Sequence, residues 1–249
     1  MKKITQGRLC YYQFKHFSKL SFINHGIFTR KGGVSKAPYD SLNIGYNVGD
    51  DPLAVQENQR RIEKIMGAES KSAIQTHSKK VHIVNSDWDN KINGDSLVAN
   101  QANILLMVKT ADCQPILLAD HDNKIIAAIH SGWRGSVLNI IESTIIKMCE
   151  LGSKPENIIA GIGPSLGPCC AEFINYKQEL PKNMWKFSVK PDYFDFWAIS
   201  KNQLIKTGIK EKNIEISKIC TRCRTDLFYS YRKNKISGRF ASVIGLKSL

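Results

Sequence analysis

Two short apolar runs flank a group of turn-forming residues in the middle of the chain, in the segment PILLADHDNKIIAAI at 115–129. Such runs, joined by Asp and Asn, are typical of two antiparallel strands in a hairpin. With His121 and Asp122 at the tip of the turn, the register places Cys113 directly opposite His130, and cross-strand Cβ atoms lie about 4.5–5.5 Å apart. A slip of one residue would put them on opposite faces. The hairpin therefore predicts a thiol and an imidazole close enough to hold one metal ion.

Helical signals lie on both sides of this hairpin. An aspartate at 50 or 51 followed by Pro52 predicts a helix that ends near Met66. Apolar residues at helical spacing predict another helix over 137–151, and Gly152 is typical of the position that ends one. Strand-like runs occupy 72–76, 81–84 and 104–108.

Two segments of the second half, LGSKPENIIAGIG and TGIKEKNIEIS, share one plan. Each has a helix-ending glycine, Gly152 or Gly208, and five residues later an asparagine, Asn157 or Asn213, that opens an apolar strand. They predict two matching helix-to-strand connections. Helices and strands mixed throughout, with no Pro-, Gly- or Ser-rich linker, predict an α+β fold with mixed sheets in a single domain over residues 1–249.

The composition constrains partners and location. Basic residues number 36 against 22 acidic ones, a net charge of +14, but lysines are scattered with no run beyond two. We expect a basic surface that attracts anions, without a dedicated nucleic-acid interface. No apolar stretch reaches 18 residues, so no membrane span is expected. The N-terminal segment lacks the apolar core of a signal peptide, and seven cysteines in such a chain favour reduced thiols in the cytoplasm.

The strongest candidate for chemistry is the set His77, Cys113 and His130. Two imidazoles and a thiolate with an open fourth position are the pattern of a catalytic zinc site, whereas calcium and magnesium prefer oxygen ligands. Asp112 is a candidate acceptor for a ligand imidazole. Two alternatives use the same residues. One is a buried structural cysteine with two ordinary histidines. The other is a thiolate–imidazolium pair for nucleophilic catalysis.

The C-x-x-C motif at Cys220 and Cys223 has the spacing of half a zinc ribbon or of a redox pair. No second C-x-x-C completes four ligands, and the adjacent Cys169 and Cys170 have a poor geometry for chelation. We therefore expect Cys220 and Cys223 to be bystanders.

Two glycine-rich turns follow predicted strands. HSGWRGS at 130–136 can present backbone N–H groups and Arg134 to an anion, and GIGPSLGP at 161–168 is equally compatible with a plain turn. Neither matches a nucleotide-binding fingerprint. The stretch DLFYSYRKNKISGRF at 226–240 interleaves aromatics with arginines, so it could stack bases, but it is more typical of a closing hairpin with NKISG as its turn.

At this level of detail the chain resembles a known family, the bacterial laccase-domain proteins. These were first labelled multicopper polyphenol oxidases and later recognised as zinc-dependent purine nucleoside phosphorylases with adenosine deaminase side activity. The resemblance covers nearly the whole chain. Its blocks are FTRKGGVS at 28–35, SLNIG at 41–45, VGDD at 48–51, QTHS at 75–78, GDSLV at 94–98, TADCQPILL at 110–118, HSGWRG at 130–135, GIGPSLGPCCAEF at 161–173, CTRCRTDLFYSYR at 220–232 and GRF at 238–240.

The resemblance implies an α/β/β/α sandwich of mixed sheets and one zinc per chain. The family's His, Cys and His ligands match His77, Cys113 and His130. The C-x-x-C recurs in the family without being a ligand pair, in agreement with a bystander role. This chain departs from the family pattern at Gln114, Ser131 and Ala171, where an apolar residue, an alanine and an aromatic are usual. Gln114 and Ala171 can change the shape of the pocket and hence the ranking of substrates.

The implied reaction is attack of phosphate on C1′ of adenosine, inosine or guanosine, with methylthioadenosine a further candidate, to give the free base and ribose 1-phosphate. In the side activity, water replaces the amino group at C6 of adenosine. Zinc with an open position can bind phosphate or activate water. Arg30 and Arg134 are candidates to orient phosphate, and Asp112 and Glu172 are candidates for the general acid. The oligomeric state stays open.

Three alternatives remain. A copper-dependent phenol oxidase would use the same ligands, but a multicopper site needs more than the six histidines of this chain. A cysteine hydrolase acting on cell-wall or other amide substrates would use Cys113 as the nucleophile. A noncatalytic binding protein would use only the pocket.

Overall fold

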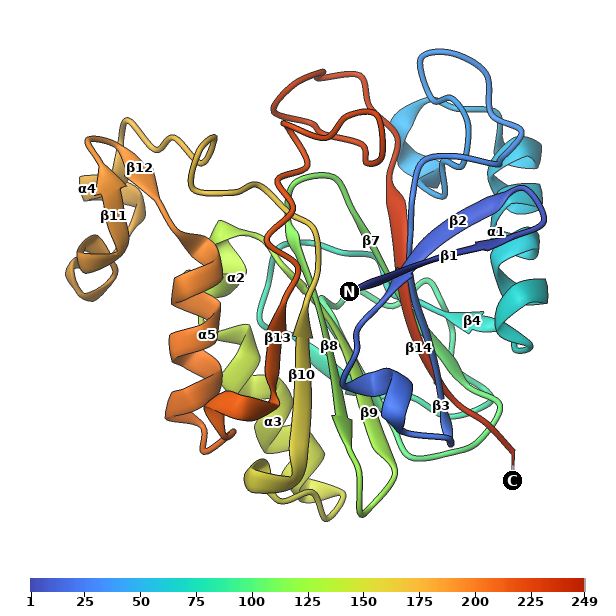
Figure 1. Cartoon of the computed structure of the whole chain (residues 1–249), viewed down its shortest axis with the longest axis horizontal. Helices are drawn as coiled ribbons and strands as arrows, with labels where there is room; N and C mark the ends of the chain where they lie inside the picture. Colours follow the sequence, from blue (N-terminus) through green and yellow to red (C-terminus); the bar gives the residue numbers. More distant parts are fainter. Residues whose placement is uncertain (249) are drawn as a thin grey trace.

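The computed structural model describes residues 1–248, which form two six-stranded sheets packed face to face (Figure 1). The order in the first sheet is β1 (Lys2–Gln6), β2 (Leu9–Gln13), β3 (Ile23–Phe28), β14 (Phe240–Leu246), β7 (Leu105–Thr110) and β4 (Ser70–Lys71). The order in the second is β13 (Ile214–Ile216), β10 (Ile158–Ile162), β8 (Gln114–Asp120), β9 (Ile125–Ser131), β6 (Ser96–Ala99) and β5 (Val81–Ile83). Both sheets mix parallel and antiparallel pairs, as predicted.

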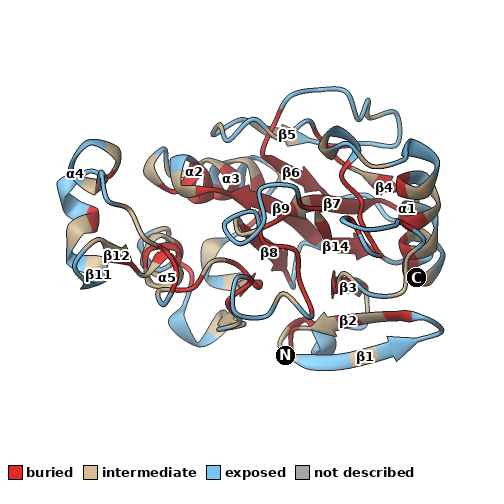
Figure 2. Ribbon diagram, turned by 90° about the horizontal axis from the view of Figure 1, so that it is seen from above, coloured by how far each residue is buried: buried red, intermediate tan, exposed pale blue. Residues whose placement is uncertain are grey.

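Helices cover the outer face of each sheet, which completes the expected α/β/β/α sandwich (Figure 1). Helix α1 (Pro52–Met66) packs its apolar face on the first sheet, and α3 (Ile140–Glu150) and α5 (Phe196–Lys206) pack on the second beside the short α2 (Trp133–Val137). The central strands are buried on both faces (Figure 2). Short 3-10 helices complete the connections: η1 (Phe17–Lys19), η2 (Tyr46–Val48), η3 (Pro155–Asn157), η4 (Lys182–Phe187) and η5 (Glu211–Asn213).

A small lobe projects from the sandwich beyond α5 (Figure 1). It contains α4 (Tyr176–Glu179) and the two-stranded ribbon β11 (Ser188–Lys190) and β12 (Tyr193–Phe194). Its own apolar cluster is centred on Phe194 and Phe196 and reaches Trp133 of α2. The lobe therefore adjoins the segment that follows β9.

The predicted hairpin is present as β8 and β9, but the predicted register differs from the observed one by two residues. Asp120 pairs with Ile125, so four residues form the turn, and Pro115 lies opposite His130. The Asp120 carboxylate causes the longer turn, because it accepts N–H bonds from Asp122 and Asn123 at 2.9 and 3.0 Å. A shift by two preserves the face of each side chain. Cys113 therefore keeps the face of His130 although it is not its direct partner.

The predicted first helix is confirmed, since the Asp51 carboxylate caps it by accepting from Leu53 N at 3.0 Å. The helix predicted over 137–151 is wrong at its start. It is broken at Asn139, whose φ of 56° is left-handed, and α2 begins before the break. Gly152 ends α3 with φ of 104°, as expected. The runs at 81–84 and 104–108 are strands, but 72–76 holds only an isolated bridge at Ile74.

The two matching connections are confirmed. Each passes from a glycine with positive φ through a 3-10 turn into a strand, and the resulting β10 and β13 are parallel neighbours. The closing hairpin predicted over 226–240 is wrong. That segment is irregular up to β14, because β14 pairs with β3 and β7 in the middle of the first sheet. The aromatic and basic residues before it instead cross the end of the sandwich.

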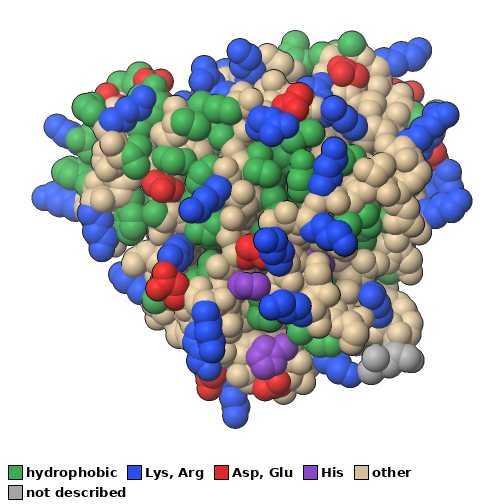
Figure 3. All heavy atoms as spheres, viewed as in Figure 1, with side chains coloured by type: hydrophobic (Ala, Val, Ile, Leu, Met, Phe, Trp, Pro, Cys, Tyr) green, Lys and Arg blue, Asp and Glu red, His purple; other side chains and the backbone are tan. Residues whose placement is uncertain are grey.

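Lysine and arginine side chains are spread in separate small groups over the face shown in Figure 3. Within residues 1–248, none of the helices combines the length and the apolar character that crossing a bilayer requires.

Candidate metal centre and adjoining pocket

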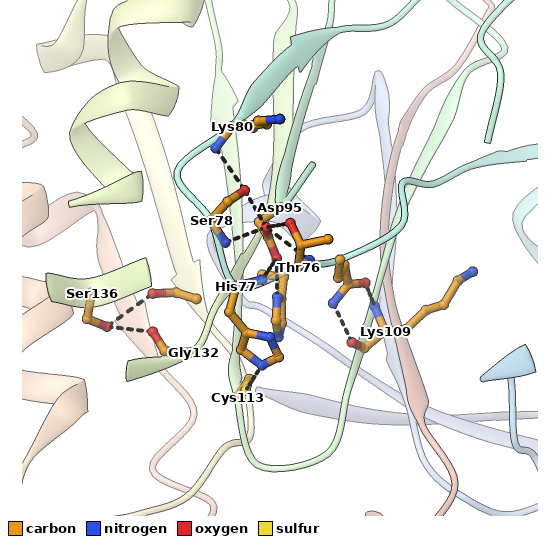
Figure 4. A network of polar contacts seen from close by, with 12 residues as sticks. Thr76, His77, Ser78, Lys80, Asp95, Lys109, Cys113, Gly132 and Ser136 are labelled. Atoms are coloured by element: carbon orange, nitrogen blue, oxygen red, sulfur yellow. Dashed lines mark hydrogen bonds and ion pairs between the residues drawn. The ribbon is translucent and has the colours of Figure 1, made fainter. Parts of the chain in front are cut away.

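Three predicted ligands meet at the open end of the β8–β9 hairpin (Figure 4). His77 lies in the loop before β5, Cys113 directly precedes β8, and His130 lies near the end of β9. One donor atom of each lies within 4.8 Å of the other two, and Cys113 Sγ is 3.7 Å from His77 Nε2. His130 is buried, Cys113 is half-buried and His77 is exposed. The centre is thus anchored in the core and open on the side of His77.

Unusual backbone geometry brings these side chains together. His77 has φ of 59° and Asp112, directly before Cys113, has φ of 86°. Such left-handed values in residues other than glycine are costly and cluster at functional sites. Gly132 closes the centre from the other strand, since a Cβ there would lie 2.7 Å from His77 Cδ2 and 3.2 Å from Cys113 Sγ. Only glycine fits at this position of HSGWRG.

Asp95 organises the two histidines. Its carboxylate accepts from His130 Nδ1 at 2.8 Å and from His77 N at 3.0 Å, and Ser78 donates to it through N and Oγ, each at 2.7 Å (Figure 4). The bond to Nδ1 leaves His130 Nε2 as the metal-facing nitrogen. Asp112 does not have this role. Its oxygens accept from Thr221 Oγ1 and from Arg232 N, each at 2.6 Å.

The electrostatics of the centre favour a thiolate. Burial opposes ionisation of Cys113, but the neighbouring imidazoles of His130 and His77 outweigh it and lower the pKa of the thiol to about 6. Burial also disfavours the charge on His130, but Cys113 and Asp95 raise its pKa to about 9. Burial opposes the charge of Asp95 too, while bonds from His130 and Ser78 lower its pKa strongly. The metal-free centre is therefore an Asp⁻–HisH⁺–Cys⁻ chain at neutral pH.

The donor set and its spacing fit zinc. Around a tetrahedral zinc ion, Zn–N and Zn–S bonds of about 2.0–2.1 and 2.3 Å put nitrogen and sulfur about 3.6 Å apart. The separation of 3.7 Å between His77 Nε2 and Cys113 Sγ is close to this value. Three donors leave one tetrahedral position for a ligand, as in catalytic sites.

A pocket of about 260 Å³ opens directly onto His77 and Cys113. Leu166, Ala171 and Phe173 contribute to it from the segment after β10, and Tyr231 and Arg232 contribute from the segment before β14. Its remaining lining residues are Ala111, Asp112, Gln114, Ser131, Gly132, Trp133, Arg134 and Phe196. Aromatic walls with a few basic and amide groups can hold a flat heteroaromatic ring and an anion.

The other candidate residues divide between this pocket and its surroundings. Arg134 and Asp112 line it. Glu172 lies in a neighbouring hollow with Arg232, where it accepts from Tyr193 OH at 3.1 Å. Arg30 is not among the lining residues, because its guanidinium donates to Asp40 O at 2.8 Å and to Thr225 O at 3.1 Å. Arg30 therefore ties two loops together and lies outside the lining of this pocket.

Sequence reasoning did not single out the pocket residues Phe173 and Phe196 or the organising Asp95, whereas Tyr231 and Arg232 lie in the 226–240 stretch of aromatics and arginines. Asp95 carries a local signal, an aspartate directly before an apolar strand in GDSLV. Phe173 and Phe196 carry none, since they reach the pocket through the small lobe and the start of α5.

Residues 24–247 match the family described as "Multi-copper polyphenol oxidoreductase laccase". The chain belongs to this family. Among its similar proteins, the "Purine nucleoside phosphorylase YfiH" of Escherichia coli (strain K12) is 33% identical over 227 residues, which cover 88% of this chain and 91% of that protein. The "Purine nucleoside phosphorylase" of Bacteroides thetaiotaomicron is 31% identical over 254 residues, with 93% and 94% covered.

Solved structures of the family share the fold. YlmD from Geobacillus stearothermophilus superposes with a TM-score of 0.87 at 26% identity, covering 99% of both chains. The hypothetical protein YfiH of Bacillus licheniformis superposes with a TM-score of 0.87 at 27% identity, covering 97% of both. The shared fold agrees with membership of the family, and the metal has to be argued from the donor atoms of this chain.

Proposed function

We propose that this chain is a zinc-dependent purine nucleoside phosphorylase that acts on adenosine, inosine and guanosine, with methylthioadenosine as a further substrate and adenosine deaminase activity at the same site. Relatives that cover about nine-tenths of the chain carry the name purine nucleoside phosphorylase. The observation that carries the proposal is the opening of an aromatic-lined pocket onto His77 and Cys113. The proposal includes a cytoplasmic location, which the seven free cysteines support because they suit a reducing compartment.

His77, Cys113 and His130 would hold the metal. Zinc is preferred over a multicopper assembly because no further histidine joins this donor cluster in residues 1–248, whereas several copper ions would need more ligands. When bound, zinc supplies a positive charge that orients an anionic or polarised ligand. The Asp95 bond to His130 Nδ1 fixes the ring so that its other nitrogen faces this position.

The aromatic side chains of the pocket are suited to the purine ring, because stacking on aromatic faces is favourable for any base. Gln114 supplies a polar contact at the pocket floor. Its Oε1 accepts from Ser200 Oγ at 2.5 Å, whereas its buried Nε2 has no hydrogen-bond partner within residues 1–248. An unpaired buried donor is costly, so a purine acceptor atom is a fitting partner. Gln114 is thus a candidate for orienting the base.

Arg134 and Arg232 are the basic groups for phosphate. The Arg134 guanidinium lies 4.8 Å from the centre of the Trp133 ring, at the exposed rim. Arg232 is held at the opposite wall, where its Nη1 donates to Glu172 O at 3.0 Å. In the reaction a phosphate oxygen bonds to C1′ while the C1′–N9 bond breaks. The base leaves with the electron pair of that bond and takes up a proton.

The deaminase activity would use the same pocket, with water adding at C6 and ammonia leaving. Both oxygens of Asp112 already accept hydrogen bonds from Thr221 and Arg232, so we assign it to positioning of the Cys113 backbone. Glu172 adjoins the pocket and keeps the role of a candidate acid.

A cysteine hydrolase is the second candidate. The lowered pKa of Cys113 and the raised pKa of His130 match a thiolate–imidazolium pair. A cysteine hydrolase would require neither phosphate nor a metal.

Product identification separates the two. Inosine is incubated with the purified protein in the presence and absence of inorganic phosphate, and hypoxanthine and ribose 1-phosphate are quantified. The proposal expects equal amounts of both products and no turnover without phosphate. Release of free ribose, or turnover that ignores phosphate, would refute phosphorolysis.

A further inference from the structure

A second cluster of metal-binding side chains lies apart from the His77 centre. Cys169 and Cys170 lie in the loop after β10, and Cys220 and Cys223 lie in the loop after β13. Their four sulfur atoms are all within 4.8 Å of one another, and Cys223 Sγ is 3.6 Å from the sulfurs of both Cys169 and Cys170. The C-x-x-C therefore lies beside the adjacent pair Cys169 and Cys170, although the sequence contains no second C-x-x-C.

Sheet topology brings the two pairs together. Because β10 and β13 are parallel neighbours, the chain leaves both at the same edge of the sheet. The pairing continues beyond the strands, since Ser165 N donates to Ile219 O at 3.2 Å and Thr221 N donates to Ser165 O at 3.0 Å. The two loops thus run side by side. Each of the two matching helix-to-strand connections thus leads into a strand, and the loop after each strand carries a cysteine pair.

Tight turns aim all four thiols at one point. Cys170 N donates to Gly167 O at 2.9 Å, which folds the adjacent cysteines into a turn. Arg224 N donates to Cys220 O at 3.0 Å, so Cys220 and Cys223 are three residues apart on one turn and share a side. This local folding removes the objection that neighbouring cysteines chelate poorly.

The spacing fits one tetrahedral ion. Four thiolates with Zn–S bonds of about 2.3 Å have sulfur–sulfur separations of about 3.8 Å. Two of the separations here are 3.6 Å and the others lie within 4.8 Å, far from the 2.03–2.05 Å of a disulfide, and all seven cysteines of the chain are free. An iron–sulfur cluster places several irons and sulfides between its cysteines and would spread them further.

Hydrogen-bond donors support thiolates at this place. Gly167 N donates to Cys220 Sγ at 3.3 Å, and Arg222 Nη1 donates to Cys170 Sγ at 3.4 Å. Cys170 and Cys220 are each only 7% exposed. A cluster of thiolates beside an arginine would have part of its negative charge compensated, and bound metal would compensate the rest.

We propose that Cys169, Cys170, Cys220 and Cys223 bind a second Zn²⁺ ion, distinct from that of the His77 centre. Four protein donors leave no open position, so this zinc is structural. The proposal departs from the expected bystander role of the C-x-x-C. It also stands independently of the phosphorolysis reaction.

The four-cysteine site adjoins one wall of the pocket. Leu166 and Ala171 flank the first cysteine pair and line the pocket, and Tyr231 follows the second pair in the same loop. Thr221, inside the C-x-x-C, donates to Asp112 beside Cys113. Loss of the structural zinc is therefore expected to loosen substrate binding, seen as a raised KM, without removing the metal of the His77 centre.

Metal analysis of protein purified without added metal or chelator tests the proposal. The wild type should contain about two zinc ions per chain. The double variant C220S/C223S should lose one of them, and the variant C113A should lose the other. C149S is the matched control, because Cys149 is an exposed cysteine outside both clusters, and it should keep both.

Cobalt substitution of C113A gives a second readout that does not depend on the stability of the double variant. Cobalt bound to four thiolates should give the strong near-ultraviolet charge-transfer absorption of a tetrathiolate site. The four cluster thiols should also resist a thiol reagent until chelator is added. The proposal is overturned if C113A binds no metal, if the four thiols react freely, or if protein kept under reducing conditions contains a disulfide among them. Iron in place of zinc would overturn the choice of metal.

Discussion

The Asp95 carboxylate lies 2.8 Å from Nδ1 of His130 and accepts a hydrogen bond from it. Both groups are buried, with exposed fractions of 2% and 4%. This bond determines the tautomer of His130, and the same carboxylate holds the backbone of His77. Asp95 therefore connects His77 and His130, which are 53 residues apart in the sequence.

Replacing Asp95 with Asn should weaken zinc binding at the His77 centre by about 10–100-fold, because the amide no longer carries the charge that raises the basicity of His130. A competition titration with a chromogenic chelator measures the affinity. Asp122→Asn, in the exposed hairpin turn, is the control and should bind normally. Unchanged affinity in Asp95→Asn would show that the carboxylate does not tune the centre.

Gly132→Ala should lower zinc affinity at the same centre by at least about 10-fold, with the fold retained. The reason is steric, since the new methyl group would lie 2.7 Å from His77 Cδ2. Gly135→Ala is a matched control from the same motif, because a Cβ there meets nothing closer than 3.4 Å. The circular dichroism of both variants should equal that of the wild type. Full zinc occupancy in Gly132→Ala would contradict the geometry of the centre.

His25 should make the protein less stable as the pH falls below about 6.5. Burial lowers the pKa of His25 to about 4, and its Nε2 accepts from Phe14 N at 2.9 Å, which requires a neutral ring. The unfolded chain, with an ordinary pKa near 6.5, binds the proton more readily, so protonation favours unfolding between these values. The expected loss from pH 7 to pH 5 is about 2 kcal/mol from this residue.

Urea unfolding of the wild type and of His25→Gln at both pH values measures this contribution. Glutamine can accept the Phe14 N–H without titrating, so the variant should lose less stability on acidification. Equal losses in the two proteins would exclude His25 as the source.

Cys113 should resist iodoacetamide in the zinc-loaded protein and react after chelation. Its thiolate is a ligand in the loaded state, whereas in the chelated protein its pKa of about 6 makes it nucleophilic at neutral pH. Mass spectrometry of the peptide that contains Cys113 reads out the modification, and the exposed Cys149 serves as the internal control. Rapid alkylation of Cys113 in the loaded protein would favour the cysteine hydrolase.

The proximity of Cys113 and His130 could be predicted from the sequence because both belong to one hairpin, whereas His77 was added by the residue types and by the family resemblance. The predicted register was wrong, since the Asp120 carboxylate captures two N–H groups and lengthens the turn. The side-chain face survived the error because the shift was by two residues. The predicted helix over 137–151 failed for a similar local reason, the left-handed Asn139.

The four-cysteine cluster could not be found by spacing along the chain. Cys169 and Cys223 become neighbours only because β10 and β13 are parallel and adjacent, a pairing that the matched connections hinted at but did not determine. The position of Arg30 could not be predicted for a comparable reason, since its guanidinium donates to Asp40 O and Thr225 O on two other loops and does not line the pocket. Contacts between distant loops depend on topology, which local patterns do not contain.

The central claim is that zinc at the His77 centre drives phosphorolysis of purine nucleosides. The most direct test measures phosphate-dependent release of hypoxanthine from inosine by the wild type before chelation, after chelation and after zinc is restored, with C113A in parallel. The account predicts that activity disappears with the zinc and returns with it, and that C113A stays inactive when zinc is added. Activity that persists in the fully chelated wild type, or in C113A, would contradict it.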